Sequence, residues 1–173
     1  MTQNFITRFA PSPTGFLHLG HAWSAMLAHD AARRAGGCFL LRIEDIDEVR
    51  CRADYVDAIY RDLEWLGLRW DGPVVFQSAR APLYQDALTR LVEMGLAYRC
   101  WCTRAEVAAS AVAPHEGEGS LYPGTCKARR EPSDGRPFCW RLDSNAACTA
   151  VGPLAWHEGE AESIRVDMAS QGD

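Results

Sequence analysis

At 173 residues, with 47% hydrophobic and 24% charged side chains, the chain has the size and composition of one globular domain. No apolar run approaches the roughly 20 residues that cross a bilayer, and the first residues lack the charged start and apolar core of a signal peptide. We therefore expect no membrane contact and a cytoplasmic location. The net charge of -5 argues against a generally basic protein that binds DNA or RNA without regard to sequence.

The first predicted elements are a strand, a helix and a second strand. Residues 4–10 form a short run that ends at a proline, and residues 38–43 (CFLLRI) form an apolar run that follows two glycines. Residues 19–35 between them are rich in alanine and end at the same glycines, which favours a helix. This pattern predicts a parallel strand pair with a right-handed crossover, and ligands bind at the carboxyl edge of such a pair.

Three more helices are predicted further along the chain. Residues 53–66 carry apolar side chains on one face, and residues 82–94 carry a stripe that we expect to be buried, formed by Leu83, Ala87, Leu91 and Met94. Thr103 and Glu106 have the spacing of a capping box before an alanine-rich stretch that reaches residue 113. Residues 114–120 and 129–137 are loop-like, and FCWRL and SIRVDM are short strand candidates.

The turn after the first strand, PSPTGFLHLGH, has the features of a phosphate site. A helix N-terminus presents unpaired N–H groups and a partial positive charge, and small residues such as Gly15 and Gly20 let an anion approach closely. His18 and His21, at the start of the helix, could donate hydrogen bonds to phosphate oxygens during nucleotidyl transfer, which is an electrostatic role. Two histidines at this position are also compatible with a surface or capping feature.

The string RFAPSPTGFLHLGH resembles the HIGH motif of class I aminoacyl-tRNA synthetases, in the form found in glutamyl-tRNA synthetases. The resemblance implies an α/β fold with a Rossmann-like parallel sheet. It also implies that an amino acid carboxylate attacks the α-phosphate of ATP, bound with Mg²⁺, to give an aminoacyl-adenylate and pyrophosphate. The ATP-binding residues that it implies are Gly15, His18, Gly20 and His21, with the two histidines as the catalytic pair.

The same resemblance implies a glutamate pocket. Its lining residues would be Arg8, Phe9, Ala10, Pro11 and Ser12. Arg8 is the candidate for selectivity, because a guanidinium pairs with a carboxylate in a forked geometry that lysine cannot copy. Residues 42–47 (RIEDID) resemble a second family segment, which implies that Glu44 meets the α-ammonium of the substrate. Without the first motif, an acidic run at a strand end is more often a solvated turn.

Three of the seven cysteines cluster with a tyrosine. An odd number of cysteines and the lack of an export signal favour reduced thiols. Three thiols with a phenol as fourth donor could hold one tetrahedral Zn²⁺, although free cysteines are also common as buried apolar residues. The spacing C-x-C and Y-x-x-x-C is similar to that of the glutamyl-Q tRNA(Asp) synthetases, which implies a zinc site at Cys100, Cys102, Tyr122 and Cys126. We interpret Cys38 and Cys139 as core residues of strands.

The resemblance also implies how the chain is divided. Residues 1–98 would be the N-terminal half of the catalytic domain, 99–130 an inserted zinc-binding segment, and 131–173 the start of the remaining domain. The family's lysine-containing KMSKS-type loop would lie outside these residues, and the one lysine present is Lys127. We therefore expect the second half of the catalytic domain to be absent, and glutamate activation to be slow or lost.

Three functions remain open from the sequence. Ile46 and residues 66–72 and 77–80 are closer to the glutamyl-Q enzymes, which implies glutamate, ATP and a queuosine-containing tRNA(Asp) as partners. The first alternative is a fragment of a glutamyl-tRNA synthetase that charges tRNA(Glu). The second is an inactive zinc-stabilised module whose basic cluster contacts RNA phosphates through Lys127, Arg129, Arg130, Arg136 and Arg141.

Overall fold

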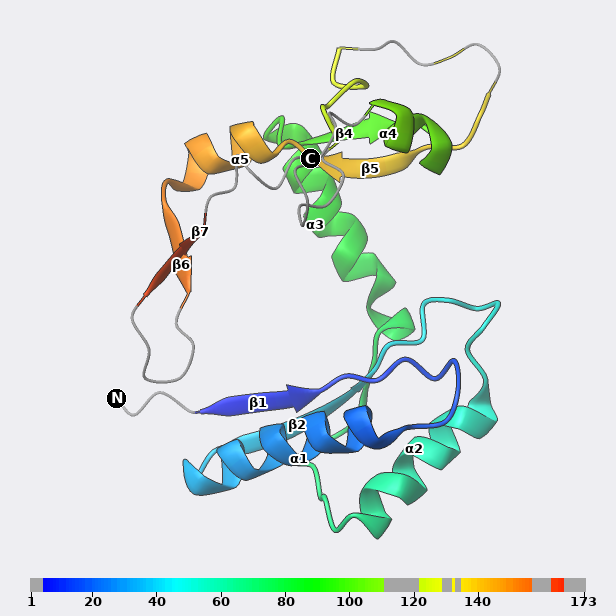
Figure 1. Cartoon of the computed structure of the whole chain (residues 1–173), viewed down its shortest axis with the longest axis vertical. Coiled ribbons are helices and arrows are strands. Elements are labelled where there is room, and N and C mark those ends of the chain that lie inside the picture. Colours follow the sequence, from blue (N-terminus) through cyan, green and yellow to red (C-terminus); the bar gives the residue numbers. More distant parts are fainter. Residues whose placement is uncertain (1–4, 111–121, 129–131, 133–134, 157–162, 167–173) are drawn as a thin grey trace. The chain divides into compact units, whose positions relative to one another are not determined.

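A computed structural model describes residues 5–110, 122–128, 132, 135–156 and 163–166 of the chain (Figure 1). The chain divides into two compact units, Met1–Tyr84 and Gln85–Asp173. None of the helices in the described ranges combines the length and the apolar character that crossing a membrane requires.

The first unit begins with the predicted β-α-β arrangement. The strands β1 (Ile6–Phe9) and β2 (Cys38–Ile43) are parallel, with Arg8 opposite Leu40, and α1 (Leu19–Arg34) connects them (Figure 1). The bounds predicted for β2 are confirmed. The strand β1 is shorter than residues 4–10, and α1 ends one residue before the predicted end.

Two glycines allow the chain to turn from α1 into β2. Gly36 has a φ of 61°, a left-handed conformation that favours glycine. A Cβ atom on Gly37 would lie 2.0 Å from the carbonyl oxygen of Phe5. That oxygen accepts a hydrogen bond from the backbone N–H of Cys38 at 2.9 Å. The glycines therefore let β2 start directly beside the residues that lead into β1.

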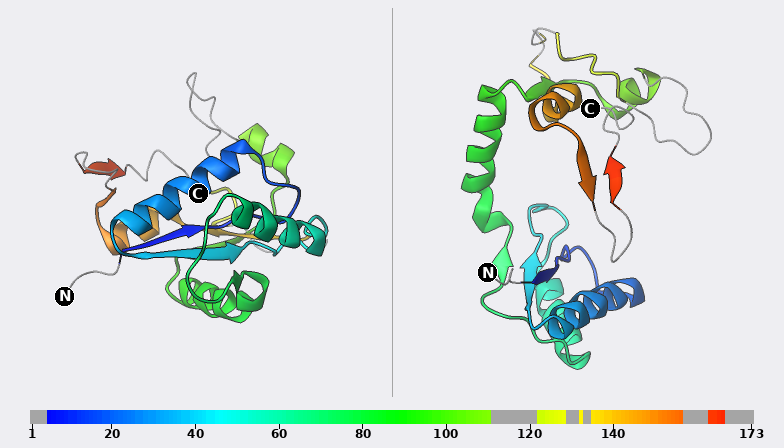
Figure 2. Two further views of the ribbon diagram at one scale, coloured as in Figure 1. Left: turned by 90° about the horizontal axis from the view of Figure 1, so that it is seen from below. Right: turned by 90° about the vertical axis from the view of Figure 1, so that its left-hand side faces the viewer.

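A third strand completes a parallel sheet in the order β1-β2-β3, which confirms the predicted sheet type. This strand, β3 (Val75–Phe76), has only two residues and was not predicted; it follows α2 (Ala53–Trp65). Both α1 and α2 pack on one face of the sheet (Figure 2). The buried core of this unit consists of Phe9, Ala25, Ala32, Phe39, Leu41, Ile43, Ile59, Leu63 and Leu68.

Cys38 is not part of this core, so the prediction that it is a core residue was wrong. Successive side chains of a strand point to opposite faces of the sheet. Phe39, Leu41 and Ile43 face the covered side and are buried, which places Cys38 on the other side, where it is exposed.

The helix α3 (Ala81–Glu93) follows a short 3₁₀ turn, η1 (Ser78–Arg80), and begins one residue before the predicted start. The expectation that its apolar stripe is buried was wrong. Within the described part of the chain α3 has no buried residue, and Leu83 and Met94 are 54% and 64% exposed. Apolar side chains at helical spacing make a face suitable for burial, but they do not determine which residues cover it.

The second unit is built around an antiparallel strand pair. The strands β4 (Ala97–Cys100) and β5 (Cys139–Leu142) place Cys100 opposite Cys139. The helix α4 (Arg104–Ser110) follows β4, and its capping box is confirmed, since the Thr103 N–H donates to Glu106 Oε2 at 2.6 Å and the Glu106 N–H to Thr103 Oγ1 at 3.2 Å.

The remaining elements of this unit are α5 (Ser144–Val151), β6 (Leu154–Trp156) and β7 (Ile164–Val166). Strands are confirmed within FCWRL and SIRVDM, whereas β4, α5 and β6 were not predicted. Cys139 lies in a strand but is exposed, so its interpretation as a core residue was wrong. It lies opposite the buried Cys100 and on the same face, so burial of one residue of a strand pair does not ensure burial of the other. Residues 111–113, the predicted loop 114–120 and much of the predicted loop 129–137 lie outside the described residues.

Candidate functional site

Two buried prolines anchor the loop between β1 and α1. The carbonyl oxygens of Pro11 and Pro13 accept backbone hydrogen bonds from Glu44 and Arg52, each at 3.0 Å. These bonds tie the loop to the residue after β2 and to the residue that caps α2. Because proline fixes φ and has no N–H group, a sharp turn can be buried here with only carbonyl groups to satisfy.

The helix α1 starts with a capping box made of two imidazoles. Gly20 donates its N–H to Nδ1 of His18 at 3.1 Å, and His18 donates its own N–H to Nδ1 of His21 at 3.2 Å. The two ring centroids are 3.9 Å apart. A nitrogen that accepts carries no proton, so each neutral ring has its proton on Nε2. The capping reading of the histidines is therefore confirmed, and the Nε2–H groups are the donors that an anion at this helix end would meet.

The position of His21 disfavours its charged form. Burial of the ring, and then the nearby His18, lower the pKa of His21 below its ordinary value of 6.5. The ring is therefore mostly neutral at pH 7. A neutral ring that donates from Nε2 fits an electrostatic role toward phosphate and leaves the capping bond in place.

A cavity of about 400 Å³ opens beside this cap. All five residues predicted for the glutamate pocket line it, together with Gly15 and His21, whereas His18 and Gly20 are not in the lining. Sequence reasoning did not name Thr14, Phe16 and Leu17, which lie within the motif, or Ser24. Ser24 lies three residues after His21 and therefore on the same side of α1. The complete lining is Arg8, Phe9, Ala10, Pro11, Ser12, Thr14, Gly15, Phe16, Leu17, His21 and Ser24.

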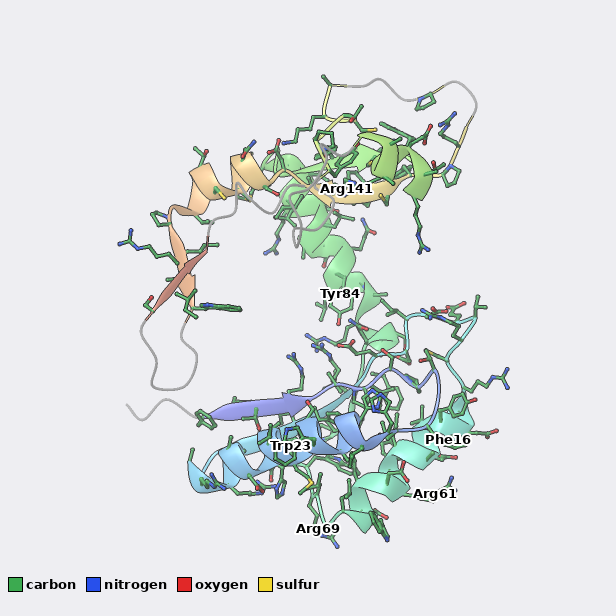
Figure 3. All side chains as sticks on the ribbon, in the orientation of Figure 1. Phe16, Trp23, Arg61, Arg69, Tyr84 and Arg141 are labelled. Atoms are coloured by element: carbon green, nitrogen blue, oxygen red, sulfur yellow. The ribbon has the colours of Figure 1, made fainter. Side chains whose placement is uncertain are left out.

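An aromatic contact holds the outer part of the loop. The ring of Phe16 meets the ring of Tyr55, on α2, edge to face with the centroids 5.1 Å apart. Figure 3 shows Phe16 close to the start of α2, while Trp23 lies along α1. The loop that lines the cavity is thus fixed at its buried prolines and again at this ring.

The acidic run after β2 is largely engaged in structural contacts. Asp45 accepts from the backbone N–H and from the hydroxyl of Ser78, at 2.9 and 2.6 Å. Burial opposes ionisation of Asp45, but these hydrogen bonds outweigh it and lower its pKa. Asp47 pairs with Arg50 at 2.6 Å, and these hydrogen bonds lower the pKa of Asp47. Both side chains therefore stabilise turns around the site.

Glu44 lies beside the first cavity rather than in its lining. It lines a second cavity of about 390 Å³, which shares Ser12 and Thr14 with the first. Its carboxylate forms an ion pair with Arg42. A substrate ammonium at Glu44 would therefore share the carboxylate with this guanidinium, and the role of Glu44 stays a prediction.

The second unit brings the four predicted metal ligands together. The Sγ atoms of Cys100, Cys102 and Cys126 lie within 4.8 Å of one another. The hydroxyl of Tyr122 is 3.3 Å from Cys100 Sγ and 3.4 Å from Cys102 Sγ. Zn–S bonds of about 2.3 Å give a tetrahedron with edges of about 3.8 Å, so these spacings suit a tetrahedral ion such as Zn²⁺. The donor set fits the metal that the resemblance implies.

Hydrogen bonds within the cluster decide which group ionises first. Burial opposes ionisation of Cys100, but hydrogen bonds, led by that of Tyr122, outweigh it and lower its pKa to about 7. Burial, and then the hydrogen bonds between its hydroxyl and the thiols, raise the pKa of Tyr122. Burial also raises the pKa of Cys102. Cys100 thus ionises more readily than Cys102, and Tyr122 stays a phenol.

The basic cluster proposed as an RNA-binding surface is engaged inside the unit. Lys127 and Arg136 form ion pairs with carboxylates at 2.9 and 3.5 Å. The guanidinium of Arg141 lies 4.0 Å from the centroid of the Tyr122 ring. The other two members, Arg129 and Arg130, lie outside the described residues. The three described cations therefore contribute to folding contacts.

We expect His21 to titrate below pH 6.5, and the substitution His18→Gln to raise its pKa toward that value, because the change removes a group that becomes positive on protonation. NMR of the ring resonances between about pH 5 and pH 8 measures this. Since folded His21 binds its proton less readily than the unfolded chain does, its contribution to stability is present above pH 6.5 and is lost as the pH falls through the lowered pKa.

The matched control is His29→Gln, further along the same helix, which should leave the pKa of His21 unchanged. A pKa of 6.5 or above for His21 in the unsubstituted chain would contradict the arrangement of the two rings.

Comparisons with known proteins match these observations to one family. The family model of the catalytic domain of class I tRNA synthetases (E and Q) matches residues 4–125. A glutamyl-Q tRNA(Asp) synthetase from Rhodobacter capsulatus is 48% identical over 92% of this chain and 63% of its own length. A protein of the same name from Symbiobacterium thermophilum is 52% identical over 75% of this chain and 43% of its own length.

Glutamate–tRNA ligases are similar as well. One from Pelobacter propionicus is 46% identical over 78% of this chain and 29% of its own length. The crystal structure of a glutamate tRNA ligase from Elizabethkingia meningosepticum, solved with its amino acid, has a TM-score of 0.72 and 25% identity over 99% of this chain and 38% of that one. This chain thus spans less than two thirds of the length of these relatives. Its parallel sheet, its imidazole-capped helix and the match over residues 4–125 place the chain in the family of class I tRNA synthetases for glutamate and glutamine, within the catalytic domain.

Proposed function

We propose that the protein of which these residues form part activates glutamate with ATP and transfers it to the queuosine base in the anticodon of tRNA(Asp). The observation that carries this proposal is the cavity at the β1–α1 corner, where Arg8 and His21 line one space of about 400 Å³. The names of the relatives described above support the choice of substrate. The cytoplasm, where tRNA is charged, is the compartment that this function implies.

Arg8 would select the amino acid. Arg8 is the third residue of β1, and its neighbour Phe9 is buried in the core. The backbone that carries Arg8 is therefore well fixed. Its planar guanidinium can donate two parallel hydrogen bonds to the side-chain carboxylate of glutamate. The amide of glutamine offers only one acceptor oxygen, so the same contact would discriminate against it.

The histidines would stabilise the phosphates of ATP. The α-carboxylate of glutamate attacks the α-phosphorus, which forms a mixed anhydride and releases pyrophosphate, with Mg²⁺ bound to the ATP. The Nε2–H groups of His18 and His21 donate to the phosphate oxygens, where negative charge grows in the transition state. Gly15 and Gly20 keep the backbone close to these oxygens, and Glu44 binds the α-ammonium group of glutamate.

A lysine for the leaving pyrophosphate is not among these residues. The sole lysine in the sequence, Lys127, lies one residue after Cys126 and is paired with Asp143 at 2.9 Å. Loss of one donor to developing charge typically costs about 100-fold or more in rate. We therefore propose that these 173 residues alone activate glutamate slowly or not at all.

Zn²⁺ is the ion that we propose for the cysteine cluster, with Cys100, Cys102, Tyr122 and Cys126 as ligands. When bound it supplies a cross-link between β4 and the segment around residue 126, which is a structural contribution. This assignment goes with the division proposed from the sequence, in which residues 99–130 form an inserted segment between residues 1–98 and 131–173.

The metal proposal predicts that the chain purifies with about one Zn²⁺ bound and that Cys126→Ser lowers this content to a small fraction, because a four-ligand site loses one of its thiolates. Cys148→Ser is the control, since Cys148 lies on α5 outside the cluster and should retain the full metal content. Elemental analysis of the purified proteins gives the stoichiometry. Equal zinc contents in the two variants, or no zinc in the unsubstituted chain, would refute the site.

The acceptor is tested by starting from preformed glutamyl-adenylate, which bypasses the activation step. We expect labelled glutamate to appear on tRNA(Asp) that carries queuosine and not on tRNA(Asp) that lacks it. Transfer to tRNA(Glu) instead would favour the alternative that these residues belong to a glutamate–tRNA ligase, which the 46% identity with such an enzyme makes a specific competitor. No transfer to any of the three RNAs would contradict the proposed transfer step.

A further inference from the structure

The face of the β4–β5 pair that carries a metal ligand also carries a cation. Directly opposed residues of an antiparallel pair point to the same side, and the register places Arg141 opposite Tyr98, two residues before Cys100. Alternate residues share a face of a strand. Arg141 therefore lies on the side of β4 from which Cys100 contributes its thiol.

Arg141 contacts the ring of one of the four proposed ligands, Tyr122. Its guanidinium carbon is 4.0 Å from the centroid of the Tyr122 ring, a cation–π distance, and only 4% of Tyr122 is exposed. The Nε atom of Arg141 is itself buried. The cation is thus held in a partly dry environment, where electrostatic contacts are stronger than in water.

The charge of the proposed metal ligands favours a cation at the position of Arg141. Three thiolates and a phenolate carry more negative charge than one Zn²⁺ neutralises, and burying the excess is costly unless a cation lies nearby. The neighbouring Lys127 is occupied by Asp143 at 2.9 Å. Arg141 is a guanidinium, which stays charged when buried and stacks on aromatic rings, so it suits this position better than a lysine would.

We propose that Arg141 is a positioning residue of the metal centre, whose guanidinium holds the Tyr122 ring over the three thiols and balances the charge of the ligands when a metal binds. The inference rests on the proposed zinc site and adds a residue that no ligand spacing identifies. It lies beyond residues 4–125, the part that the family model matches. It also separates Arg141 from the basic cluster considered as an RNA surface.

The experiment compares metal binding by the full chain with binding by Arg141→Gln and Arg141→Lys. Outer-sphere partners of metal ligands are typically worth about 10- to 100-fold in metal affinity, so we expect a loss of this size for Arg141→Gln in a chelator competition with Zn²⁺. The Zn²⁺ affinity of Arg141→Lys should lie between those of the unsubstituted chain and Arg141→Gln, because lysine keeps the charge but lacks the planar stacking group.

Arg99→Gln is the matched control. Arg99 is adjacent to Cys100 in sequence and also lies over aromatic rings, those of Phe138 and Trp140 at 4.6 and 5.5 Å, neither of which belongs to a proposed ligand. The Arg99→Gln variant should bind Zn²⁺ as tightly as the unsubstituted chain. An equal loss in the Arg99 and Arg141 variants would indicate a general charge effect and overturn the proposal.

The visible spectrum of the Co²⁺-loaded proteins separates a positioning role from loss of packing. If Arg141 acts through Tyr122, the ligand-field bands of Arg141→Gln should change in the same way as those of Tyr122→Phe, while those of Arg99→Gln stay unchanged. Circular dichroism of the loaded proteins checks folding. Should Arg141→Gln not fold, Arg141→Lys decides the matter, since a wild-type affinity and spectrum in that variant would overturn the proposal.

The result in the unsubstituted chain shows which of the two claims fails. If it binds neither Zn²⁺ nor Co²⁺, the metal centre itself is wrong and the role of Arg141 is wrong with it. If it binds metal and Arg141→Gln matches it in affinity and spectrum, the metal centre stands and the role of Arg141 is refuted.

Discussion

The first N–H groups of a helix have no partner within that helix, and at the start of α1 two imidazole nitrogens take part in satisfying this end. His18 accepts from Gly20, and His21 accepts from His18, so each ring is fixed by a bond at Nδ1. The carbonyl groups of the buried residues Pro11 and Pro13 accept hydrogen bonds that fix the loop between β1 and α1. The backbone of the loop beside the cavity and the ring of His21 are therefore held in place by contacts within the protein.

In the proposed function each histidine would have two roles. Substituting either ring would remove a proposed donor to phosphate and also a hydrogen bond at the end of α1, so a loss of activity alone would not separate the two effects. In the second unit, too, one side chain makes several contacts. The hydroxyl of Tyr122 meets two thiols and a backbone N–H, while its ring meets Arg141. In both units, side chains that are proposed to bind a substrate or a metal also make structural contacts.

Local signals predicted the elements with strong boundaries. Two glycines fixed the start of β2, and the bounds 38–43 are confirmed, as is the capping box of Thr103 and Glu106. The two-residue strand β3 has too few residues to show a period, so it was missed. The stripe of α3 and the environment of Cys38 depend on which side of an element other residues cover, and a local pattern carries no information on that.

The residues of the candidate sites were found by motif, whereas their neighbours were not. The string from Arg8 to His21 identified most of the lining of the first cavity, but Ser24 required the turn of α1 to be considered. The spacing of the cysteines identified four potential ligands, but Arg141 comes from β5, and only strand register brings it to them. Contacts that depend on strand register or on packing can be identified only once the fold is known.

The central claim is that the β1–α1 corner binds an activated glutamate through Arg8. The most direct measurement is calorimetric binding of two non-hydrolysable adenylate analogues, glutamyl and glutaminyl, to the unsubstituted chain, to Arg8→Lys and to the control Arg61→Lys on the exposed side of α2 (Figure 3). Charge-assisted forked contacts predict a preference for the glutamyl analogue of about 10- to 100-fold, lost in Arg8→Lys and kept in Arg61→Lys. Equal affinity for the two analogues, or a preference that survives Arg8→Lys, would contradict the account.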